Sequence, residues 1–373
     1  MIKRTIQDKL IDQCFRSKAI ILYWPRQVGK TTLVKHIQEH FEDKKSLYVT
    51  WDDIEIKEVW KASLQVLSQL VAWSELVIID EAQKIDDIGN ILKLLVDSFP
   101  EKQIIATGSS SFDLAHNISE PLTWRAYIHH LYPLSLEEIY EQKPLSSITI
   151  EQRMLYGAYP NVIADDSTNP QDYLKHIIDH YLYKDILAFE GIKKHSLVMK
   201  LTQALALQIG NEFSYLELAN LLWSNKDTIA KYMLILEQAF IIKTLSPLHS
   251  NKRREIKAHK KVFFWDLWVR NASINNFNPL NLRNDVGQLW ENLCFIERTK
   301  HIQYHNIPHR QYFWRETSWP EIDYIEQEAD NYYAREFKYS TKKWASLPNS
   351  FNDKYPKNEF EVIRPDTIWW FVR

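Results

Sequence analysis

Residues 20–32 place a lysine and two hydroxyls directly after a short apolar run. Gly29, Lys30 and Thr31 form the second half of the pattern G-x-x-x-x-G-K-[ST]. In that pattern backbone N–H groups surround phosphate, the lysine contacts the β- and γ-phosphate oxygens, and the hydroxyl binds Mg²⁺. The first glycine of the pattern is absent, because Trp24 stands at its position. The predicted nucleotide-binding residues of this loop are Trp24, Pro25, Arg26, Gln27, Val28, Gly29, Lys30, Thr31 and Thr32.

Two other apolar runs also end in polar residues. Asp80 and Glu81 follow one run, and Ser109 follows another. Ligands of open α/β sheets bind at the carboxyl ends of strands, so these residues are expected beside the phosphate loop. Asp80 is predicted to hold Mg²⁺ together with Thr31, and Glu81 to orient or deprotonate the attacking water. Ser109 is predicted to sense the γ-phosphate. The alternative is that the two carboxylates only cap the next helix.

Arg125 precedes a further predicted strand. An arginine there is placed to act as an arginine finger on a nucleotide, in the same chain or in a neighbouring subunit. The alternative is a surface ion pair.

The C-terminal third carries a second constellation of charged residues. Asp323 opens one predicted strand, and Glu336 and Lys338 close the next, thirteen residues later. This D…ExK spacing resembles the PD-(D/E)xK nuclease fold, which implies that Asp323 and Glu336 bind Mg²⁺ and that Lys338 positions the attacking water. Glu291, on a preceding helix, matches the additional acid of such sites. The alternative is that these acids serve structure or binding without cleavage. The predicted catalytic residues of the whole chain are Glu81, Lys30, Arg125 and Lys338; the predicted metal ligands are Thr31, Asp80, Glu291, Asp323 and Glu336.

Apolar runs and helical patterns alternate over the first 140 residues, which is typical of a parallel α/β sheet. Residues 135–190 look helical, with Ser135 and Glu138 spaced as a capping box. Strands return after residue 260. The predicted strands are 20–23, 46–50, 76–80, 103–107, 126–131, 262–266, 311–315, 321–326, 332–337 and 361–363; the predicted helices include 30–41, 56–73, 90–98, 173–189 and 289–299.

Residues 211–245 show a different pattern. Ser214 is placed to cap one short helix and Asn225 to cap a second helix over 226–238, and an apolar β-like run follows. Helix, tight turn, helix and β-wing describe a winged helix-turn-helix. Its second helix would present a DNA-reading face or a protein-docking face. The predicted exposed residues of that face are Lys226, Asp227, Thr228, Lys231 and Tyr232.

A basic stretch follows at residues 252–261. It holds six cations opposed only by Glu255, which makes it a candidate for phosphate contact with DNA. The alternative is a solvated linker. The cations are Lys252, Arg253, Arg254, Lys257, Lys260 and Lys261.

The motifs together resemble those of AAA-type, archaeal-like ATPases. The matching segments are Pro25–Thr32, Ile79–Gln83, Thr107–Ser110, and Leu122–Arg125 before Pro133–Glu138. The resemblance extends over nearly the whole chain and implies an α/β fold: a P-loop NTPase parallel sheet with a helical lid, a winged helix-turn-helix and a restriction-endonuclease-like α/β domain. The implied domains are residues 1–134, 135–194, 195–250 and 251–373.

The resemblance implies ATP and Mg²⁺ as cofactors and a Mg²⁺-dependent ATPase that controls its C-terminal half. One alternative is a Mg²⁺-dependent DNA nuclease gated by nucleotide. Another is a nucleotide-binding adaptor that docks protein partners without turnover. The resemblance leaves oligomerisation open.

Composition sets further bounds. The 373 residues carry a formal net charge of −2, so any DNA-binding surface must be local. No apolar run approaches the length of a membrane span, and the N-terminus lacks the pattern of a secretory signal. Two distant cysteines indicate neither a disulfide framework nor a Cys-based zinc site. These features favour a cytoplasmic protein that does not enter a membrane.

Tryptophan stands at several positions where glycine is expected. The chain has only 7 glycines but 14 tryptophans. The five positions fall in the phosphate loop, in the helix-turn-helix turn, in a hairpin, and at two family glycines. We therefore raise the hypothesis that their codons are UGA and specify glycine in the source genome. The positions are Trp24, Trp124, Trp223, Trp268 and Trp319.

Overall fold

The computed structural model divides the chain into two compact units, Met1–Pro133 and Leu134–Arg373. No described helix combines the length and apolar character that a membrane span requires. The structure describes residues 2–23, 25, 27–50, 64–108, 122–141, 150–164, 170–171, 174, 194–251, 255, 258–316, 320–340, 342 and 344–373.

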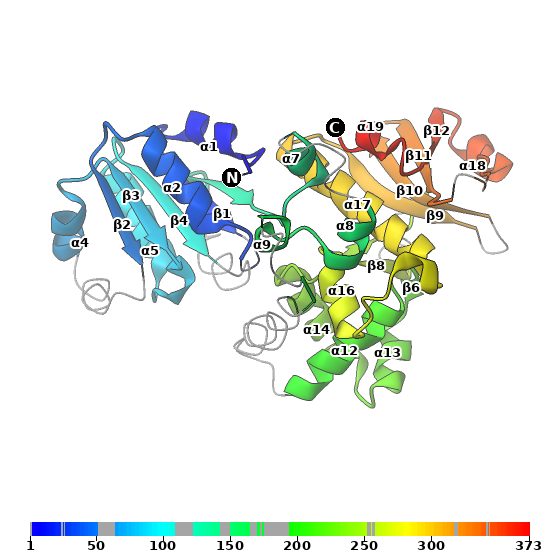
Figure 1. The fold of residues 1–373 in the computed structure, drawn as a ribbon. Coiled ribbons are helices and arrows are strands. Elements are labelled where there is room, and N and C mark those ends of the chain that lie inside the picture. The colour runs from blue at the N-terminus through cyan, green and yellow to red at the C-terminus, as the bar shows by residue number, and fades with distance from the viewer. Residues whose placement is uncertain are drawn as a thin grey trace. The chain divides into compact units, whose positions relative to one another are not determined.

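The first unit is built on a parallel five-stranded sheet in the order β2-β3-β4-β1-β5, which confirms the predicted parallel sheet (Figure 1). Strands β1 (Ala19–Tyr23), β3 (Leu76–Asp80) and β4 (Gln103–Gly108) are buried along their whole length. Such uninterrupted apolar strands are typical of the centre of a parallel sheet that is covered on both faces. Strands β2 (Ser46–Thr50) and β5 (Ala126–His130) form the two edges and are only partly buried.

Helices connect these strands, as parallel pairing requires. Helix α2 (Lys30–His40) buries Leu33, Val34 and Ile37, which lie three or four residues apart on one face. The predicted helix over 56–73 is described only as α4, because residues 51–63 lie outside the described part. The other helical elements of this unit are α1 (Gln7–Gln13), α4 (Leu64–Val71), η1 (Ala82–Lys84) and α5 (Ile88–Ser98).

The second unit begins with α7 (Leu136–Tyr140), whose predicted capping box between Ser135 and Glu138 is confirmed. A small antiparallel sheet in the order β6-β8-β7 follows among helices. The predicted helix over 173–189 lies outside the described residues. The elements of this part are α8 (Ile150–Tyr156), α9 (Pro160–Ala164), α12 (His195–Leu207), β6 (Glu212–Phe213), α13 (Tyr215–Leu221), α14 (Lys226–Gln238), β7 (Ile242–Leu245) and β8 (Lys260–Phe264).

The two helices expected around residue 225 are present. Asn225 caps α14, and its side chain accepts a hydrogen bond from the Thr228 N–H at 2.7 Å. Ser214 precedes α13, but its side chain makes no capping hydrogen bond, so that part of the prediction was wrong. Tyr232 was predicted to lie on the exposed recognition face, and that prediction was wrong, because its side chain is buried on the inner face of α14.

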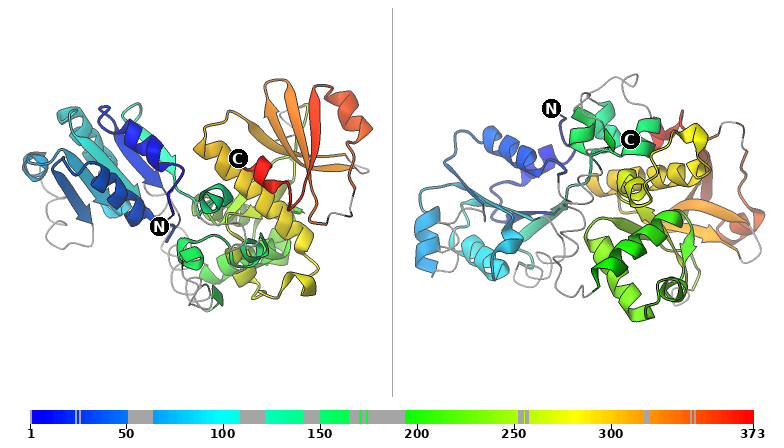
Figure 2. Two further views of the ribbon diagram at one scale, coloured as in Figure 1. Left: turned by 45° about the horizontal axis from the view of Figure 1, so that its top comes forward. Right: turned by 60° about the horizontal axis from the view of Figure 1, so that its bottom comes forward.

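A four-stranded sheet in the order β12-β11-β10-β9 occupies the C-terminal part. Strands β9, β10 and β11 pair antiparallel, and β12 pairs parallel to β11. Both views in Figure 2 show the long helix α17 (Val286–Tyr304), coloured yellow to orange, beside this sheet. The other elements are α16 (Leu267–Ser273), η4 (Leu280–Leu282), β9 (Arg310–Arg315), β10 (Glu321–Glu328), β11 (Asn331–Phe337), α18 (Asn349–Lys354), β12 (Asn358–Ile363) and α19 (Ile368–Phe371).

The register of β10 shifts between Ile322 and Ile325. Ile322 pairs with Trp314, whereas Ile325 pairs with Tyr312, so β10 holds one more residue than β9 across this interval. A bulge of this kind bends a strand and redirects its side chains. It contains Asp323, the first residue of the D…ExK spacing.

The structure describes three of the five unusual tryptophans. Trp124 has a φ of 68° and Trp223 a φ of 50°, the left-handed region that favours glycine, and their side chains are 87% and 95% exposed. Trp268 differs from the expectation for a glycine position. It is buried in the first turn of α16, packs edge-on against Tyr159, and buries its indole N–H without a hydrogen-bond acceptor among the described residues. Trp24 and Trp319 lie outside the described residues.

Candidate functional site

Strand register brings the phosphate loop to the polar ends of two other strands. Tyr23, the last residue of β1, pairs with Gly108 of β4, and Ile79 of β3 pairs with Ala106 of the same strand. The loop after β1 and the carboxylates after β3 therefore lie at one edge of the sheet. Gly29 has a φ of 92° and immediately precedes α2. This conformation is easy only for glycine, and it turns the chain into the helix at Lys30.

Lys30 is paired with both predicted carboxylates. Its ammonium lies 3.3 Å from Asp80 Oδ1 and contacts a carboxylate oxygen of Glu81. Glu81 itself has a φ of 55° and accepts a hydrogen bond from the Gln83 amide at 2.6 Å. The structure thus brings together the lysine, the expected metal-binding acid and the expected base. Lys30 therefore compensates the charge of these carboxylates.

Asp80 is held by two hydroxyls that come from neighbouring strands. Thr107 donates to Asp80 Oδ1 at 2.5 Å, and Tyr48 donates to Oδ2 at 2.6 Å. Burial, followed by the hydrogen bond to the Asp80 carboxylate, raises the pKa of Tyr48 well above its usual value, so the phenol keeps its proton. Thr31 also hydrogen-bonds Tyr48. A carboxylate and a hydroxyl joined through one phenol are oxygen ligands that suit Mg²⁺, so these residues fit the metal that the motif implies.

Arg4, which the sequence did not indicate as a site residue, contacts the backbone of the phosphate loop. Its guanidinium is buried and donates to the carbonyls of Val28 at 2.7 Å and Tyr132 at 2.6 Å. Arg125 Nε lies 2.7 Å from Asp97 Oδ1. In this structure Arg125 therefore forms the surface ion pair that was the alternative to an arginine finger. Trp24, Arg26 and Ser109 lie outside the described residues; Pro25, Gln27, Val28 and Thr32 lie in the loop and first helical turn where the sequence put them.

The second cluster forms where β10 and β11 pair. Asp323 Oδ2 accepts a hydrogen bond from the Phe337 N–H at 2.8 Å, and Glu336 Oε2 accepts one from the Asp323 N–H at 3.4 Å. Lys338 lies 2.5 Å from Glu336 Oε1 and 3.8 Å from Asp323 Oδ2. The three residues of the D…ExK spacing are therefore in mutual contact.

Glu291 joins this cluster from α17, together with two residues that the sequence analysis had not assigned to it. Lys261 Nζ lies 2.8 Å from Glu291 Oε1 and 2.5 Å from Glu321 Oε1. Lys261 is only 3% exposed in its side chain, so it does not belong to a DNA-contacting surface, and that part of the basic-stretch prediction was wrong. Residues 252–254, 256 and 257 lie outside the described part. Lys261 belongs to β8, in which every residue after Lys260 is buried, so a strand prediction that began at residue 260 would have placed it in a buried strand.

These side chains line an open cleft of about 830 Å³. Gly210 forms part of its wall, and a Cβ at this position would lie 3.2 Å from Glu291 Oε2. Gly210 also has a φ of 74°, so the wall needs glycine for two reasons. The lining includes four carboxylates, those of Glu291, Glu321, Asp323 and Glu336.

Burial and crowding change the acidity of the cleft carboxylates. Burial raises the pKa of Glu291 to about 8, the charge of Asp323 adds to this rise, and Lys261 opposes it. Burial and Asp323 likewise raise the pKa of Glu336, while Lys338 lowers it. The surrounding carboxylates outweigh burial for Lys261 and raise its pKa, so it stays an ammonium.

The chain matches three protein families in consecutive segments. Residues 16–140 match the AAA domain family. Residues 148–280 match a domain of unknown function, DUF8612, and residues 286–367 match another, DUF4143. The residues of the two sites fall in the first and third segments, apart from Lys261 and Gly210, which belong to the second, and Arg4, which precedes the first.

Several curated relatives share most of the chain. An uncharacterised protein of Methanocaldococcus jannaschii is 26% identical over 325 residues, covering 80% of this chain and 69% of its own length. An uncharacterised protein of Mycobacterium tuberculosis is 27% identical over 331 residues, covering 87% and 71%. Among solved structures, AMPPCP-bound DnaA from Aquifex aeolicus is 12% identical with a TM-score of 0.32, covering 69% of this chain and 92% of its own. That overall structural similarity is weak.

Proposed function

We propose that the protein hydrolyses ATP with Mg²⁺ and uses this cycle to control a metal-dependent site in its C-terminal part, because residues 16–140 match the AAA domain family. One observation carries the ATPase proposal: Lys30, Asp80 and Glu81 meet at the carboxyl edge of the parallel sheet. This is the edge at which open α/β sheets bind ligands.

The residues of the first site have separate roles in this proposal. Lys30 leaves Glu81 and binds the β- and γ-phosphate oxygens, which frees the Glu81 carboxylate to accept a proton from the attacking water. Asp80 and Thr31 hold Mg²⁺, which when bound neutralises charge on the phosphates. Tyr48 and Thr107 keep the Asp80 carboxylate oriented. Ser109 stays a predicted γ-phosphate contact, and Arg125 must leave Asp97 if it is to act as an arginine finger.

For the C-terminal part we propose a nuclease-like domain of the PD-(D/E)xK kind. The order helix, three antiparallel strands, helix and parallel strand supports this assignment, as does the contact of Asp323, Glu336 and Lys338 at paired strand ends. In this proposal Asp323, Glu336 and Glu291 hold Mg²⁺, and Lys338 positions the water that attacks a phosphodiester. The substrate is DNA, and the helices α13 and α14 with β7 and β8 serve as a winged helix that binds DNA or a protein partner.

The ATPase proposal is tested by measuring phosphate release from ATP by the full chain in excess Mg²⁺. Glu81→Gln keeps the size and hydrogen bonds of the side chain but removes the base, so we expect the rate to fall by roughly 10²-fold or more. Glu101→Gln, an exposed glutamate of the same unit, is the matched control and should retain the wild-type rate. Equal rates in the two variants would rule out Glu81 as the base.

The nuclease proposal needs its own experiment. Lys338→Ala should abolish Mg²⁺-dependent DNA cleavage while leaving ATP hydrolysis intact, and the exposed Lys357→Ala is its control. Cleavage that is equally fast with and without ATP would contradict nucleotide control. If the wild type binds ATP but neither releases phosphate nor cleaves DNA, the protein is instead a nucleotide-binding adaptor that acts through protein contacts.

A further inference from the structure

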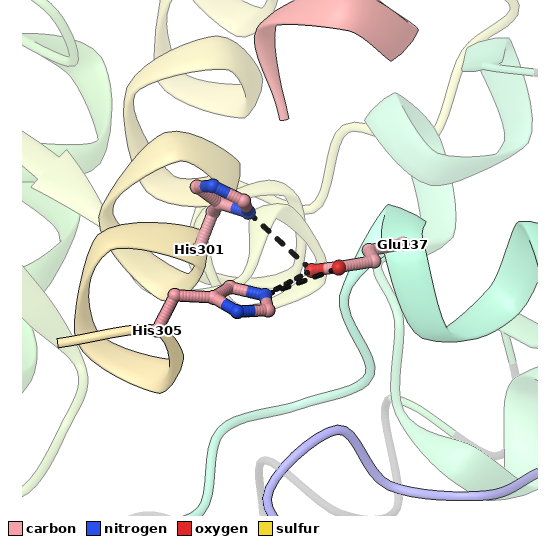
Figure 3. A group of neighbouring side chains, drawn as sticks. All are labelled: Glu137, His301 and His305. Atoms are coloured by element: carbon pink, nitrogen blue, oxygen red, sulfur yellow. Dashed lines mark hydrogen bonds and ion pairs between the residues drawn. The ribbon is translucent and has the colours of Figure 1, made fainter. Parts of the chain in front are cut away.

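Three potential metal ligands meet in the second unit, away from both sites described above. Glu137 comes from α7, and His301 and His305 come from α17 (Figure 3). His305 Nε2 lies 3.1 and 3.2 Å from the two carboxylate oxygens of Glu137, and His301 Nδ1 lies 3.5 Å from one of them. Among the described residues, this is the one group of three such side chains whose ligand atoms lie within 4.8 Å of one another.

Helix geometry explains why the two histidines act together. Residues four apart in a helix lie on the same face, one turn apart. The centroids of the two imidazole rings accordingly lie 4.5 Å apart, with the ring planes tilted by 40°, and Figure 3 shows both rings turned toward the Glu137 carboxylate. A His-x-x-x-His pair on one helix, completed by a carboxylate from a second element, is a donor set that Zn²⁺ uses.

The spacing of the ligand atoms also fits a tetrahedral ion. With metal–ligand bonds of about 2.0–2.1 Å, neighbouring ligands in a tetrahedron lie about 3.3–3.4 Å apart. Glu137 Oε2 lies 3.2 Å from His305 Nε2 and 3.5 Å from His301 Nδ1, so both separations from this one carboxylate oxygen are close to that value.

The start of α7 is held beside α17 by contacts that do not involve the histidines. The Leu136 N–H donates to Glu297 Oε2 at 2.7 Å, and Lys300 Nζ donates to the Leu134 carbonyl at 3.2 Å. These two contacts join the residues just before Glu137 to α17. The backbone that carries Glu137 is therefore already held beside the two histidines, which lowers the cost of organising a metal site.

The cluster also keeps an open side. The side chains of Glu137 and His301 are each only 10% exposed, whereas His305 is 40% exposed. A site with three protein ligands and access to solvent has room for a water molecule as the fourth ligand. Two imidazoles favour zinc and neighbouring transition metals over Mg²⁺ and Ca²⁺, which prefer oxygen ligands.

We propose that Glu137, His301 and His305 form a site for Zn²⁺, separate from both Mg²⁺ sites, that fastens α7 to α17. Because this ion binds the folded state, it stabilises the second unit by linking two helices that are distant in sequence. The proposal does not depend on ATP hydrolysis or on DNA cleavage.

The test is Zn²⁺ binding to the full chain by equilibrium dialysis, after treatment with chelator and in an excess of Mg²⁺ that occupies oxygen-only sites. We expect one tight equivalent in the wild type and an affinity at least roughly 100-fold weaker in His301→Ala and His305→Ala. His259→Ala, at an exposed histidine outside the cluster, is the matched control and should bind as the wild type does. Circular dichroism of each metal-free variant establishes that it is folded.

Co²⁺ provides a second readout that a structural defect alone would not produce. Bound Co²⁺ should give visible absorption bands without a thiolate charge-transfer band, and His305→Gln should abolish these bands while the partly exposed position keeps the protein folded. The proposal is overturned if the wild type binds no tight equivalent of Zn²⁺, or if His301→Ala and His305→Ala bind it as tightly as His259→Ala. In that case the cluster is an ion pair between glutamate and histidine only.

Discussion

Lys261 Nζ lies 2.8 Å from Glu291 Oε1, in a pair that is buried and joins β8 to α17 across 30 residues of sequence. Glu321, at the start of β10, provides a second carboxylate at 2.5 Å. Lys261 thus links three elements around the C-terminal cleft, and its charge compensates carboxylates that would otherwise repel one another.

Lys261→Met should therefore lower the free energy of unfolding strongly. At a pH above 8, where Glu291 is ionised, removing its lysine partner leaves a buried charge uncompensated, which costs about 3–5 kcal/mol. Chemical denaturation of the metal-free protein measures the effect. Lys260→Met, at the preceding and more exposed position of β8, is the control and should change the free energy by less than about 1 kcal/mol. Similar losses in both variants would contradict this role of Lys261.

The raised pKa of Glu291 predicts a dependence of stability on pH. Its pKa is about 8 in the folded protein against an ordinary value of 4.5, so the folded state holds this proton more tightly than the unfolded state. The resulting stabilisation is complete below about pH 4.5 and is lost as the pH rises through 8. Glu291→Gln stays neutral at every pH and should flatten this part of the profile. The measurement is urea unfolding of the wild type and of Glu291→Gln at pH 5 and pH 8.5 with chelator present. An equal change in the free energy of unfolding between the two pH values in both proteins would contradict the prediction.

Tyr48 is expected to be a positioning residue for ATP hydrolysis. Tyr48→Phe removes the hydrogen bond to Asp80 while keeping the ring, so the carboxylate loses one of its two hydroxyl partners. We expect kcat for ATP to fall about tenfold, corresponding to about 1.4 kcal/mol, with a smaller change in thermal stability. Raising the Mg²⁺ concentration should recover part of the loss. Tyr127→Phe on the edge strand β5 is the control, and a loss of equal size there would point to a general effect on the sheet.

Trp223 provides a direct test of the glycine hypothesis. A left-handed conformation costs a residue with a Cβ about 1–2 kcal/mol relative to glycine, and this exposed side chain has little packing to lose. Trp223→Gly should therefore raise the free energy of unfolding by about 1 kcal/mol. Trp73→Gly is the control, because Trp73 is also partly exposed but lies outside the set of positive-φ residues. A gain in both variants, or in neither, would argue against a glycine position.

The hypothesis also has a test at the level of the gene. If UGA specifies glycine in the source genome, the codons of Trp24, Trp124 and Trp223 are UGA, and codons elsewhere include UGG for genuine tryptophans. UGG at these three positions would end the idea. Trp268 is the position at which the structure agrees least with it, since a glycine there would leave the space now filled by a buried indole.

The sequence by itself determined the elements of the first sheet and the identity of its polar ends. Buried strands of a parallel sheet are continuous apolar runs, so strand 76–80 was predicted at its observed bounds. The partly buried edge strand 46–50 was also predicted at its observed bounds. The same local rules predicted the capping box at Ser135 and the asparagine cap of α14, because a cap depends on residues only three positions apart.

Only the tertiary structure decided which distant residues complete each site. Lys261 reads as one cation in a basic stretch until the pairing of β8 turns it toward Glu291 and Glu321. The bulge at Asp323 and the meeting of Glu137 with two histidines likewise depend on contacts between elements that are far apart in the chain. Local propensities extend over one turn of a helix or one strand, whereas burial, ion pairing and metal-ligand geometry arise from packing. The types of the site residues could therefore be predicted from the sequence, but the distant residues that contact them could not.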